Sequence, residues 1–498
     1  MLEMIKRIAS GGDFDIEIVI IIPSSGIPIS LHPAQILNIT IYEDITVGAI
    51  TGEMLIHNQA ALSNIGPIIG EEYLKIKMRT PSVEDSEDII DSTENPFYIY
   101  QVANKTHVGE GTEGLNLYFT SSEAMNNFRT KISKTLEGTY SDIVKKMLVD
   151  YLDCKKTCYI EPSAGVKKIV SPNLKPFDII SMAQKQAVTE KNLSPTYLFY
   201  ETLNGGYHFR SLDSLYDQES KWFYTTSKAG SKVMKGGILH VLKELETLLS
   251  YNVNHNNIMN DTITGALGSK LIVHDIFNKS YSEHTYNYLD NFKDEKHLDD
   301  GSPLHSSSPI NKNGNRISDF TGRVFLEPTS IKDVYKSTSA TQQTDRGNYE
   351  FTAQNPDKWL QRRNSQMEKI KRGITINASV HGNTIVSAGD IVTIEVPFHT
   401  QVESNENNKL DKFLKGKFLV VRVRHDFVME DRNHKTSLTC VRDSMPEELE
   451  FDDDLPMEIK PIEQGAEIIT ELYHSYEYVR EGGSFRPTGV HYPPRSST

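Results

Sequence analysis

Two segments constrain the fold of this chain more than any others. They are Tyr197–Leu215, which reads YLFYETLNGGYHFRSLDSL, and Ser387–Ser444, which opens with SAGDIVTIEVP and contains GKFLVVRVRHDF. Both consist of short runs of β-branched and aromatic residues separated by turn-forming residues, a pattern typical of strands and hairpins. Neither contains a set of catalytic side chains. We therefore expect a β-rich protein with a structural role rather than an enzyme.

The length and composition indicate a multidomain protein. A chain of 498 residues predicts two to four domains, because single cores stop growing well below that size. No apolar run approaches the roughly 20 residues of a membrane-spanning helix, so we expect no membrane insertion. Ile16–Pro23 is short enough to be a buried strand. Three cysteines favour a reducing compartment without a disulfide framework.

The net charge bears on possible partners. With 53 basic and 67 acidic residues the chain carries a formal charge of −14. General nucleic-acid binding requires a surplus of lysine and arginine to neutralise phosphates, so the charge argues against it. An acidic surface is compatible with DNA passing without being held. Solubility alone explains the same charge.

The first 130 residues predict several antiparallel strands. Alternating apolar residues mark strands at Ile36–Glu43 and Tyr73–Met78, and further strands are expected at Phe97–Val102 and Leu115–Phe119. The acidic interval Ser82–Asp91 predicts a flexible loop between them. Several short strands at this spacing are typical of a barrel or a sandwich.

Residues 131–215 predict a small α+β unit between β-forming segments. Thr120 with Glu123 and Thr139 with Asp142 both match the helix capping box. Pro176 is a favourable first residue for a further helix. The turn at residues 204–206 then predicts a hairpin between YLFYET and YHFRSL.

The remainder of the chain is again rich in predicted strands. Residues 296–318 have no apolar periodicity and predict an exposed loop, and 404–409 predict a polar loop. The part after 446 is acidic and then rich in Pro and Gly, which indicates an extension. Whether the two β-rich blocks arose by duplication stays open. A strand is expected at Leu271–Phe277, a helix at Trp359–Ile370, and strands at Ile374–Val380, Ile391–Val396 and Phe418–Val423.

Three motifs resemble functional sites but have a simpler structural explanation. Gly109–Gly114 matches G-x-G-x-x-G, yet it precedes a strand rather than a helix, so we interpret it as a hairpin turn. Cys154 and Cys158 have no second pair to complete a zinc site. His274–Asp275 and His425–Asp426 are neighbours in strands and point to opposite faces, which excludes concerted acid–base action.

The acids near the hairpin have two interpretations. Glu201 and Asp213 could form the paired carboxylates of a glycosidase. We favour a cross-strand ion pair between Glu201 and Arg210. The basic Trp359–Lys371 segment is interpreted as a solvated helix face or a docking surface. We therefore predict no catalytic, cofactor-binding or metal-binding residues.

Four ordered segments give the chain a resemblance to a known family. They are NITIYEDITVGAITGEMLIHNQAALSNIGPIIGEEYLKIKMRTP at 38–81, PFDIISMAQKQAV with the hairpin at 176–215, GSKLIVHDIFNKSYSEHTYNY at 268–288, and WLQRRNSQ through RDS at 359–444. Together they resemble the baseplate hub protein of contractile-tailed, T-even-type bacteriophages. The loop at 296–318 and the part after 446 match no pattern of that family.

The resemblance implies a mainly β fold with an α+β insert. It implies a first tail-tube-like β-barrel domain at 1–130, an inserted α+β domain at 131–215, a second tube-like β-barrel domain at 216–445 and a C-terminal extension at 446–498. Segments 36–58 and 374–396 are expected in the barrel walls. Residues 446–498 are expected to contact a neighbour or to be a solvated end.

The resemblance also implies a function. Three chains would form a ring that adapts the sixfold tail tube to the threefold central spike. DNA would pass through the lumen without specific binding. The implied partners are further copies in a homotrimer, the tail tube protein, the spike protein and other baseplate proteins. The implied location is the virion tail baseplate, assembled in the host cytoplasm. The alternatives are a spike-associated peptidoglycan hydrolase and the hub of a bacterial contractile injection system.

Overall fold

The computed structural model describes most of the chain in two compact units. The units are Met1–Glu448 and Leu449–Thr498. The described residues are 11–24, 27–57, 68–79, 89–109, 112–226, 244–276, 279–329, 356–397, 410–411, 413–447, 478–481 and 484–487. In the second unit these residues form one antiparallel hairpin, β25 (Tyr478–Glu481) and β26 (Ser484–Pro487). The rest of the predicted extension and the loop predicted at 404–409 lie outside the described residues.

The first β block is a run of antiparallel strands from residue 15 to residue 121. Its neighbours follow the order β3–β4–β8–β7–β5–β1–β2, and β6 pairs with β5. The strands predicted in this block are confirmed. They are β1 (Asp15–Ile22), β2 (Ile29–Ser30), β3 (Ile36–Asp44), β4 (Thr51–His57), β5 (Tyr73–Arg79), β6 (Ile89–Asp91), β7 (Phe97–Gly109) and β8 (Thr112–Ser121), with a 3-10 turn η1 (Pro33–Gln35).

Alternation explains why these segments form strands. In β5, Leu74, Ile76 and Met78 are buried while the residues between them face outward. The loop predicted at Ser82–Asp91 is wrong at its end, since Ile89–Asp91 pairs with β5 and Ile90 is buried. Residues 82–88 are outside the described part of the chain.

The second β block combines strands that are far apart in sequence. Its strands are β14 (Ser220–Thr225), β15 (Leu248–Asn254), β20 (Ile374–His381), β21 (Ile391–Glu395), β22 (Gly416–Val428) and β23 (Asn433–Arg442). They follow the order β15–β20–β23–β22–β21–β14, and only β14 and β21 run parallel. A bridge between Thr225 and Thr247 joins the end of β14 to the start of β15. The block is therefore curled, so that the two ends of its strand order meet at this bridge.

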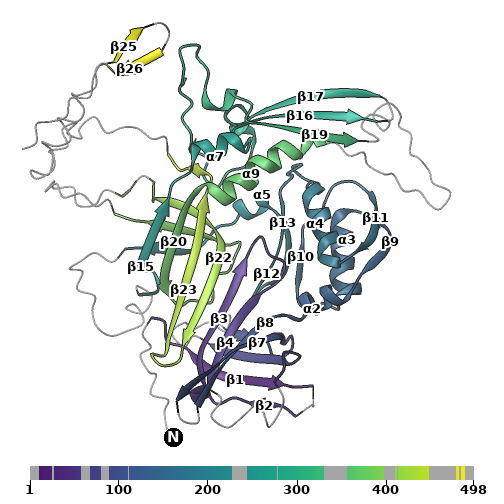
Figure 1. Cartoon of the computed structure of the whole chain (residues 1–498), viewed down its shortest axis with the longest axis vertical. Helices are drawn as coiled ribbons and strands as arrows, with labels where there is room; N and C mark the ends of the chain where they lie inside the picture. Colours follow the sequence, from purple (N-terminus) through teal and green to yellow (C-terminus); the bar gives the residue numbers. More distant parts are fainter. Residues whose placement is uncertain are drawn as a thin grey trace, which may run out of the picture. The chain divides into compact units, whose positions relative to one another are not determined.

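One strand joins the two β blocks. The start of β22 pairs with β21, with Gly416 opposite Ile394. Its end, Arg422–Val428, pairs with β3 of the first block. The register shift between Val420 and Arg422 marks the change of partner. Figure 1 shows β22 beside β3, and the described residues of both blocks belong to one 14-stranded sheet.

The insert (residues 131–215) has its own core of helices against two small sheets. One sheet is β9 with β11, and the other has the order β10–β13–β12. The predicted hairpin and the helix beginning at Pro176 are confirmed. The elements are β9 (Ile132–Gly138), α3 (Tyr140–Lys146), a π-helix η2 (Met147–Tyr151), β10 (Cys158–Ile160), β11 (Lys167–Leu174), α4 (Pro176–Gln186), β12 (Tyr197–Thr202) and β13 (Gly206–Ser211), with α2 (Ser122–Arg129) before and α5 (Leu212–Tyr216) after them.

Only one of the two predicted capping boxes forms. Thr139 accepts a hydrogen bond from the Asp142 amide and caps α3, as predicted. The box of Thr120 and Glu123 is wrong, because α2 begins one residue later with Ser121 at its N-cap. The Thr120 hydroxyl instead donates to the Ile50 carbonyl at 2.9 Å. Glu123 pairs with a lysine described below.

A third group of elements surrounds helix α9. A three-stranded sheet has the order β17–β16–β19, and β18 pairs with β24. The strand predicted near Leu271 is confirmed as β16. The elements are α7 (Ile258–Ile263), β16 (Gly268–Asp275), β17 (Ser280–Asn287), α8 (Tyr288–Asn291), η3 (Phe292–Asp294), β18 (Ser302–Pro303), η4 (Ile317–Asp319), β19 (Arg323–Thr329), η5 (Pro356–Lys358), α9 (Leu360–Arg372) and β24 (Ser444–Met445).

Helix α9 is the clearest difference from expectation. The sequence predicts a solvated face or a docking surface, and the structure contradicts the solvated face, since it buries polar residues of this helix, including Gln361, Gln366 and Lys369. Gln361 donates to the Ser269 carbonyl of β16, and Gln366 accepts a hydrogen bond from Thr196 of the insert. These polar neighbours satisfy the buried polar side chains, while Ile370 and Met367 of the same helix pack against the apolar core of the second block. No helix in the described ranges is long and apolar enough to span a membrane.

Candidate functional site

Buried polar contacts between distant segments are the most distinctive chemistry of the structure. The described residues contain no group of three or more His, Cys, Asp or Glu side chains arranged to hold a metal ion. What they contain instead are charged side chains removed from water at the joints between the two β blocks, the insert and α9. A buried charge is stable only when it is paired or hydrogen-bonded, so these joints depend on their partners.

Lys156 joins the insert to the first β block. Its ammonium lies 2.7 Å from carboxylate oxygens of both Glu123 and Glu201. The second oxygen of Glu201 accepts hydrogen bonds from the Ile50 amide at 3.1 Å and the Ser121 hydroxyl at 2.5 Å. Burial lowers the pKa of Lys156, but the two carboxylates outweigh it and raise this pKa overall. The lysine is therefore charged, and we call this set the Lys156 joint.

Glu43 joins three parts of the chain. It extends from β3, and its two oxygens accept hydrogen bonds from the amides of Leu203 and Ala388, both at 2.8 Å. Leu203 lies in the hairpin of the insert, and Ala388 precedes β21. Burial raises the pKa of Glu43 to about 7, although both amide hydrogen bonds act in the opposite direction.

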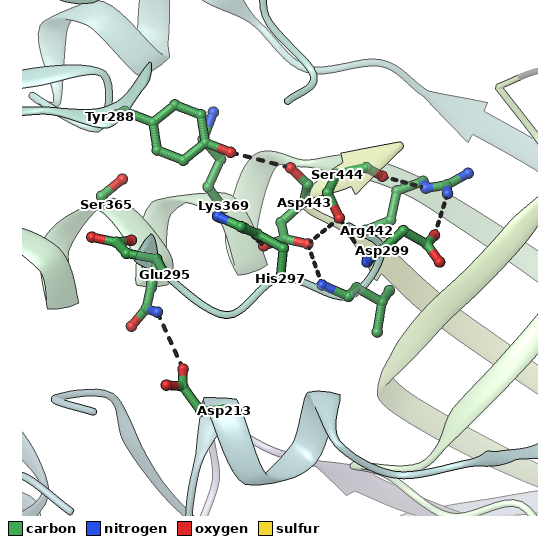
Figure 2. Close-up of polar contacts among 12 residues, drawn as sticks. Asp213, Tyr288, Glu295, His297, Asp299, Ser365, Lys369, Arg442, Asp443 and Ser444 are labelled. Atoms are coloured by element: carbon green, nitrogen blue, oxygen red, sulfur yellow. Dashed lines mark hydrogen bonds and ion pairs between the residues drawn. The ribbon is translucent and has the colours of Figure 1, made fainter. Parts of the chain in front are cut away.

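Around α9 and the end of β23, several titratable groups lie close together, and Figure 2 shows most of them. We call this set the α9 junction: Asp213, Asp261, Tyr288, Glu295, His297, Asp299, His305, Arg362, Lys369, Arg442 and Asp443. Arg362 lies 3.0 Å from Asp213 and 3.7 Å from Glu295. Burial raises the pKa of Glu295 to about 7 despite the opposing charge of Arg362.

Asp443 and His297 form a buried pair in the middle of the junction. Nδ1 of His297 lies 2.8 Å from Asp443, which also accepts from the Leu298 amide at 3.2 Å. Burial alone would raise the pKa of Asp443, but the hydrogen bond with His297 and its charge hold this pKa below the usual range. The same hydrogen bond raises the pKa of His297 against the effect of burial. Both shifts favour the ionic form of the pair.

Arg442 is the most enclosed cation of the junction. Its side chain is 0% exposed and lies 2.7 Å from Asp299. It also donates to the carbonyls of Phe413, Lys415 and Ser444. These contacts satisfy the guanidinium on several sides, which suits the fork geometry of arginine. Arg442 therefore ties the end of β23 to the segment before β22 and to the 297–305 segment.

Lys369 completes the junction from α9. Its ammonium is 2.6 Å from Nε2 of His305 and 3.7 Å from Asp261, and it lies over the Tyr288 ring. Burial lowers its pKa to about 8. His305 and His297 belong to the loop predicted to be exposed at 296–318. That prediction holds for residues 306–314, which are exposed, and is wrong for His297, Leu298 and His305, which are buried.

Glu201 and Asp213, the two acids of the glycosidase interpretation, lie far apart in the structure. Glu201 lies opposite Tyr207, and Tyr197 lies opposite Ser211. Asp213 follows Ser211, so it and Glu201 are at opposite ends of the hairpin, at least four strand positions or roughly 13 Å apart. Retaining glycosidases need carboxyl groups about 5 Å apart and inverting ones at most about 9.5 Å. The two acids instead pair with Lys156 and Arg362.

The predicted ion pair between Glu201 and Arg210 is also wrong. The turn of residues 203–205 places Leu198 opposite Arg210, three positions from Glu201. The Nε of Arg210 donates to the Ser214 hydroxyl at 3.3 Å instead. A shift of three residues in the hairpin register therefore separates the two charges.

The other motifs have structural roles in the described residues. Gly109 pairs with Thr112 in the β7–β8 hairpin, as predicted. His274 is exposed and Asp275 is buried, so these neighbours point apart. His425 is buried against His434 at 3.1 Å, whereas Asp426 accepts a hydrogen bond from Thr40.

Sequence reasoning missed Glu43, Lys369, Arg442 and Asp443. One signal could have indicated Arg442 and Asp443. Arg442 ends the alternating strand β23 and Asp443 follows it directly. Because side chains in such a strand point alternately into the core, a charged residue there can be buried. Glu43 gave a similar signal at the end of ILNITIYED. Lys369 gave no such signal, because it is one of four basic residues in WLQRRNSQMEKIK and nothing in the segment sets it apart from the others.

Comparison with known proteins gives one significant relative among curated sequences. The chain is 21% identical over 412 residues to the probable baseplate hub protein gp334 of Vibrio phage KVP40, an alignment that covers 82% of this chain and 90% of the phage protein. No family model matches. This similarity confirms the resemblance to phage baseplate hub proteins and a mainly β fold with an α+β insert.

Solved structures show a partial likeness over much of the chain. A tail protein from Neisseria meningitidis MC58 has 10% identity and a TM-score of 0.49, covering 86% of this chain and 97% of that one. The 43 kDa tail protein of prophage MuSo2 from Shewanella oneidensis has 8% identity and a TM-score of 0.46, covering 86% and 98%.

Proposed function

We propose that this chain is a structural baseplate hub protein of a phage tail, and that three copies form a ring adapting the sixfold tail tube to the threefold spike. The observation that carries the proposal is the similarity along 82% of the chain to a probable baseplate hub protein, of which 90% is covered. Such coverage includes both β blocks and the insert, so the likeness is not confined to one module.

The arrangement of the described residues is consistent with a mechanical part. β22 belongs to both β blocks, so neither can rotate freely against the other. Buried polar contacts, Glu43 and the Lys156 joint among them, connect both blocks to the insert. A ring that transmits force between a tube and a spike requires rigid connections of this kind. The separation of Glu201 from Asp213 offers no support for a hydrolase acting on sugar chains.

The proposed domain division follows the apolar cores. One core lies in the first block, a second in the insert and a third in the second block. We propose domains at 1–130, 131–215 and 216–445, with 446–498 as an extension that contacts a neighbour. The core of the first block includes Phe427 of β22, so the first domain takes one strand segment from the second.

An exposed sheet face is a suitable surface for contact between copies. We call it the arm face, formed by Lys270, Ile272, His274, Tyr281, Val324, Leu326 and Pro328 on β16, β17 and β19. Val324 is 56% exposed, Leu326 69% and Tyr281 72%. Exposed apolar patches commonly mark protein interfaces, and a strand edge invites pairing with another chain. The arm face therefore supports the proposed trimer.

The decisive experiment is the mass of the purified chain in solution. A species of three times 56.3 kDa supports the ring, and a monomer at all concentrations contradicts it. Leu326→Asp should lower trimer affinity by at least about tenfold, because it places a charge in an apolar contact. Ile310→Asp is the matched control, since Ile310 is 57% exposed on the loop at 306–314. Equal effects of both variants would exclude the arm face.

The remaining partners follow from the same proposal. The tail tube protein and the spike protein would bind opposite faces of the ring, and DNA would cross the lumen without specific contacts. The chain would assemble in the host cytoplasm and remain in the virion tail baseplate. Reconstitution with separately purified tube and spike proteins tests this directly: ternary complexes with a 6:3:3 ratio of tube, hub and spike support the adaptor, whereas binding of neither protein contradicts it.

A further inference from the structure

Two cysteines of the insert face each other across a short loop. Cys154 follows the π-helix η2, and Cys158 begins β10. Their Sγ atoms are 4.0 Å apart, and both lie near the Lys156 carbonyl, at 3.9 and 3.5 Å. Both cysteines are half-buried, whereas Cys440, the third cysteine of the chain, is fully buried in the second block.

The two thiols are not equivalent. The hydrogen bond with Cys154 lowers the pKa of Cys158, against the effect of burial. The same hydrogen bond, together with burial, raises the pKa of Cys154. Cys158 is therefore the thiol that ionises first. A thiolate next to a second thiol is the arrangement that thiol–disulfide exchange requires.

We propose that Cys154 and Cys158 are a redox pair that a small-molecule disulfide converts into an intramolecular disulfide. The sulfur atoms must approach from 4.0 Å to about 2.0 Å. The sulfur atoms therefore need to move together by about 2 Å. The single short loop between the cysteines holds them together, so the reaction is intramolecular and favoured over pairing between chains.

The reaction balances with glutathione disulfide as the oxidant. The Cys158 thiolate attacks one sulfur of glutathione disulfide, the disulfide bond breaks, and one glutathione thiolate leaves and takes a proton. Cys154 then loses its proton to solvent and attacks Sγ of Cys158, which releases the second glutathione. Two protein thiols are oxidised, and one glutathione disulfide is reduced to two glutathione molecules.

The disulfide would fix the loop that carries Lys156. The Thr157 carbonyl accepts a hydrogen bond from the Tyr207 amide at 2.9 Å. Gly206 has φ +76°, and a Cβ atom there would lie 2.3 Å from that carbonyl, so glycine permits the close approach. The loop is thus anchored to β13 on one side and to the Lys156 joint on the other. Closing it covalently would stabilise the joint between the insert and the first β block.

Formation of the disulfide does not depend on the proposed function. Only the setting in which it would form rests on the proposal that the chain is a phage hub protein. A particle assembled in a reducing cytoplasm and released into an oxidising medium would form the disulfide after release. The joint would then be strengthened in the free particle. Failure of the oxidation experiment would leave the hub assignment untouched, and a monomeric chain could still form the disulfide.

The test is oxidation of the purified full-length chain with glutathione disulfide, followed by intact mass and thiol alkylation. The expected product is about 2 Da lighter than the reduced chain, because two hydrogens are lost. It should retain one thiol, Cys440, that alkylates only after denaturation. Peptide mapping should find Cys154 linked to Cys158. An unchanged mass with three free thiols, or a bond that involves Cys440, overturns the proposal.

Single substitutions separate the roles of the two cysteines. Cys154→Ser should accumulate a stable glutathione adduct on Cys158, because the second thiol is missing. Cys158→Ser should react roughly tenfold more slowly, because Cys154 stays half-buried in this variant and burial alone raises the pKa of its thiol. Cys440→Ser is the control and should oxidise like the parent. Equal reaction rates of the two single variants would contradict the assignment of Cys158 as the attacking thiol.

The effect on the Lys156 joint has its own readout. The oxidised parent should melt at a higher temperature than the reduced parent, and the difference should vanish in Cys154→Ser. The difference in melting temperature should also be smaller in Lys156→Met, because the loop no longer holds the Lys156 joint in this variant. A disulfide that forms without raising the melting temperature would overturn the proposed stabilisation of the joint.

Discussion

Two buried charged residues, one from each β block, are stabilised in different ways. In the first block, the fully buried Glu72 accepts hydrogen bonds from the amides of Ile69, Gly70 and Glu71, all within three residues of it. At the end of the second block, Arg442 pairs with Asp299, a residue 143 positions away. The first arrangement is local and needs only a turn, whereas the second requires two distant segments to meet.

The same difference appears in the strands. The first block consists of strands that follow one another between residues 15 and 121 and share an almost wholly local core. The second block collects strands from residue 220 to residue 442, and its core also includes Ile45 and Leu198 from the other parts. Local contacts leave a visible pattern in the sequence, and long-range contacts do not. Variants in the two blocks test this difference.

The largest effect is expected from Arg442→Met. Removing this cation leaves Asp299 without its partner and three carbonyls without a donor, which should lower the free energy of unfolding by about 3–5 kcal/mol. Urea denaturation measures the change. Arg422→Met is the matched control, since Arg422 pairs with Asp44 at 2.6 Å but is 63% exposed, and its loss should cost under about 1 kcal/mol.

Equal losses in these two variants would contradict the distinction between buried and exposed pairs. If Arg442→Met does not fold, Arg442→Met combined with Asp299→Asn provides the alternative. The double variant removes the unpaired carboxylate and should recover at least about 1 kcal/mol of the loss. No recovery would show that the guanidinium matters through its carbonyl contacts rather than through Asp299.

Leu117→Ala tests the apolar core of the first block. Leu117 lies on β8 and is fully buried, so the substitution removes packed side-chain atoms and should lower the free energy of unfolding by about 2–5 kcal/mol. Because no charge is involved, the loss should be the same at low and high salt. A loss that depends strongly on salt would contradict an apolar origin.

Acid should weaken the strand pair β22–β23 through His425 and His434. Burial lowers the pKa of His425 to about 4 and that of His434 as well. As pH falls below about 6.5, the two histidines bind protons in the unfolded chain but remain neutral in the folded chain, so the free energy of unfolding decreases. For His425 alone the loss at pH 5 is about 2 kcal/mol. Glu43 and Glu295, whose pKa values are raised, act in the opposite direction.

His425→Gln isolates this contribution. The carboxyl groups titrate similarly in the parent and the variant, so their effect cancels in the difference. When the pH is lowered from 7.5 to 5, the parent should lose about 2 kcal/mol more free energy of unfolding than the variant does. Urea denaturation at both pH values measures it. A difference independent of pH would exclude His425 as the titrating group.

The smallest effect is expected from Thr139→Ala in the insert. The substitution removes the N-cap of α3 and should lower the free energy of unfolding by about 1 kcal/mol. Ser133→Ala on β9 is the control, since Ser133 is exposed and should change stability by under about 0.5 kcal/mol. Thermal unfolding compares the two. A loss of several kcal/mol for Thr139 would indicate a tertiary role that this local contact does not have.

Particular residues show where sequence reasoning succeeds and where it fails. Ile36–Glu43 is rich in β-branched residues and Tyr73–Met78 alternates between buried and outward-facing residues, so their strands were predictable, and Pro176 marked the start of α4. The box at Thr120 failed because Thr120 bonds to the Ile50 carbonyl, 70 residues away. Strands β15, β17 and β19 were missed because their residues are largely exposed and alternate weakly.

The candidate joints were less predictable than the fold. Glu201 and Asp213 were identified as important, but their partners Lys156 and Arg362 come from elements 45 and 149 residues away. The interpretation of α9 as a solvated face or a docking surface followed from its basic sequence. Its burial depends on polar neighbours such as Ser269 and Thr196, and a single segment carries no information about its neighbours.

The amino-acid sequence by itself determined the strands of the first β block, the insert's hairpin and helices, and the resemblance to phage hub proteins. These properties depend on side-chain alternation, turn residues and caps, which act over a few residues. Only the tertiary structure decided that β22 serves both blocks and which acid meets which base. Pairing of that kind depends on the register of distant strands, where a shift of a few residues changes every partner.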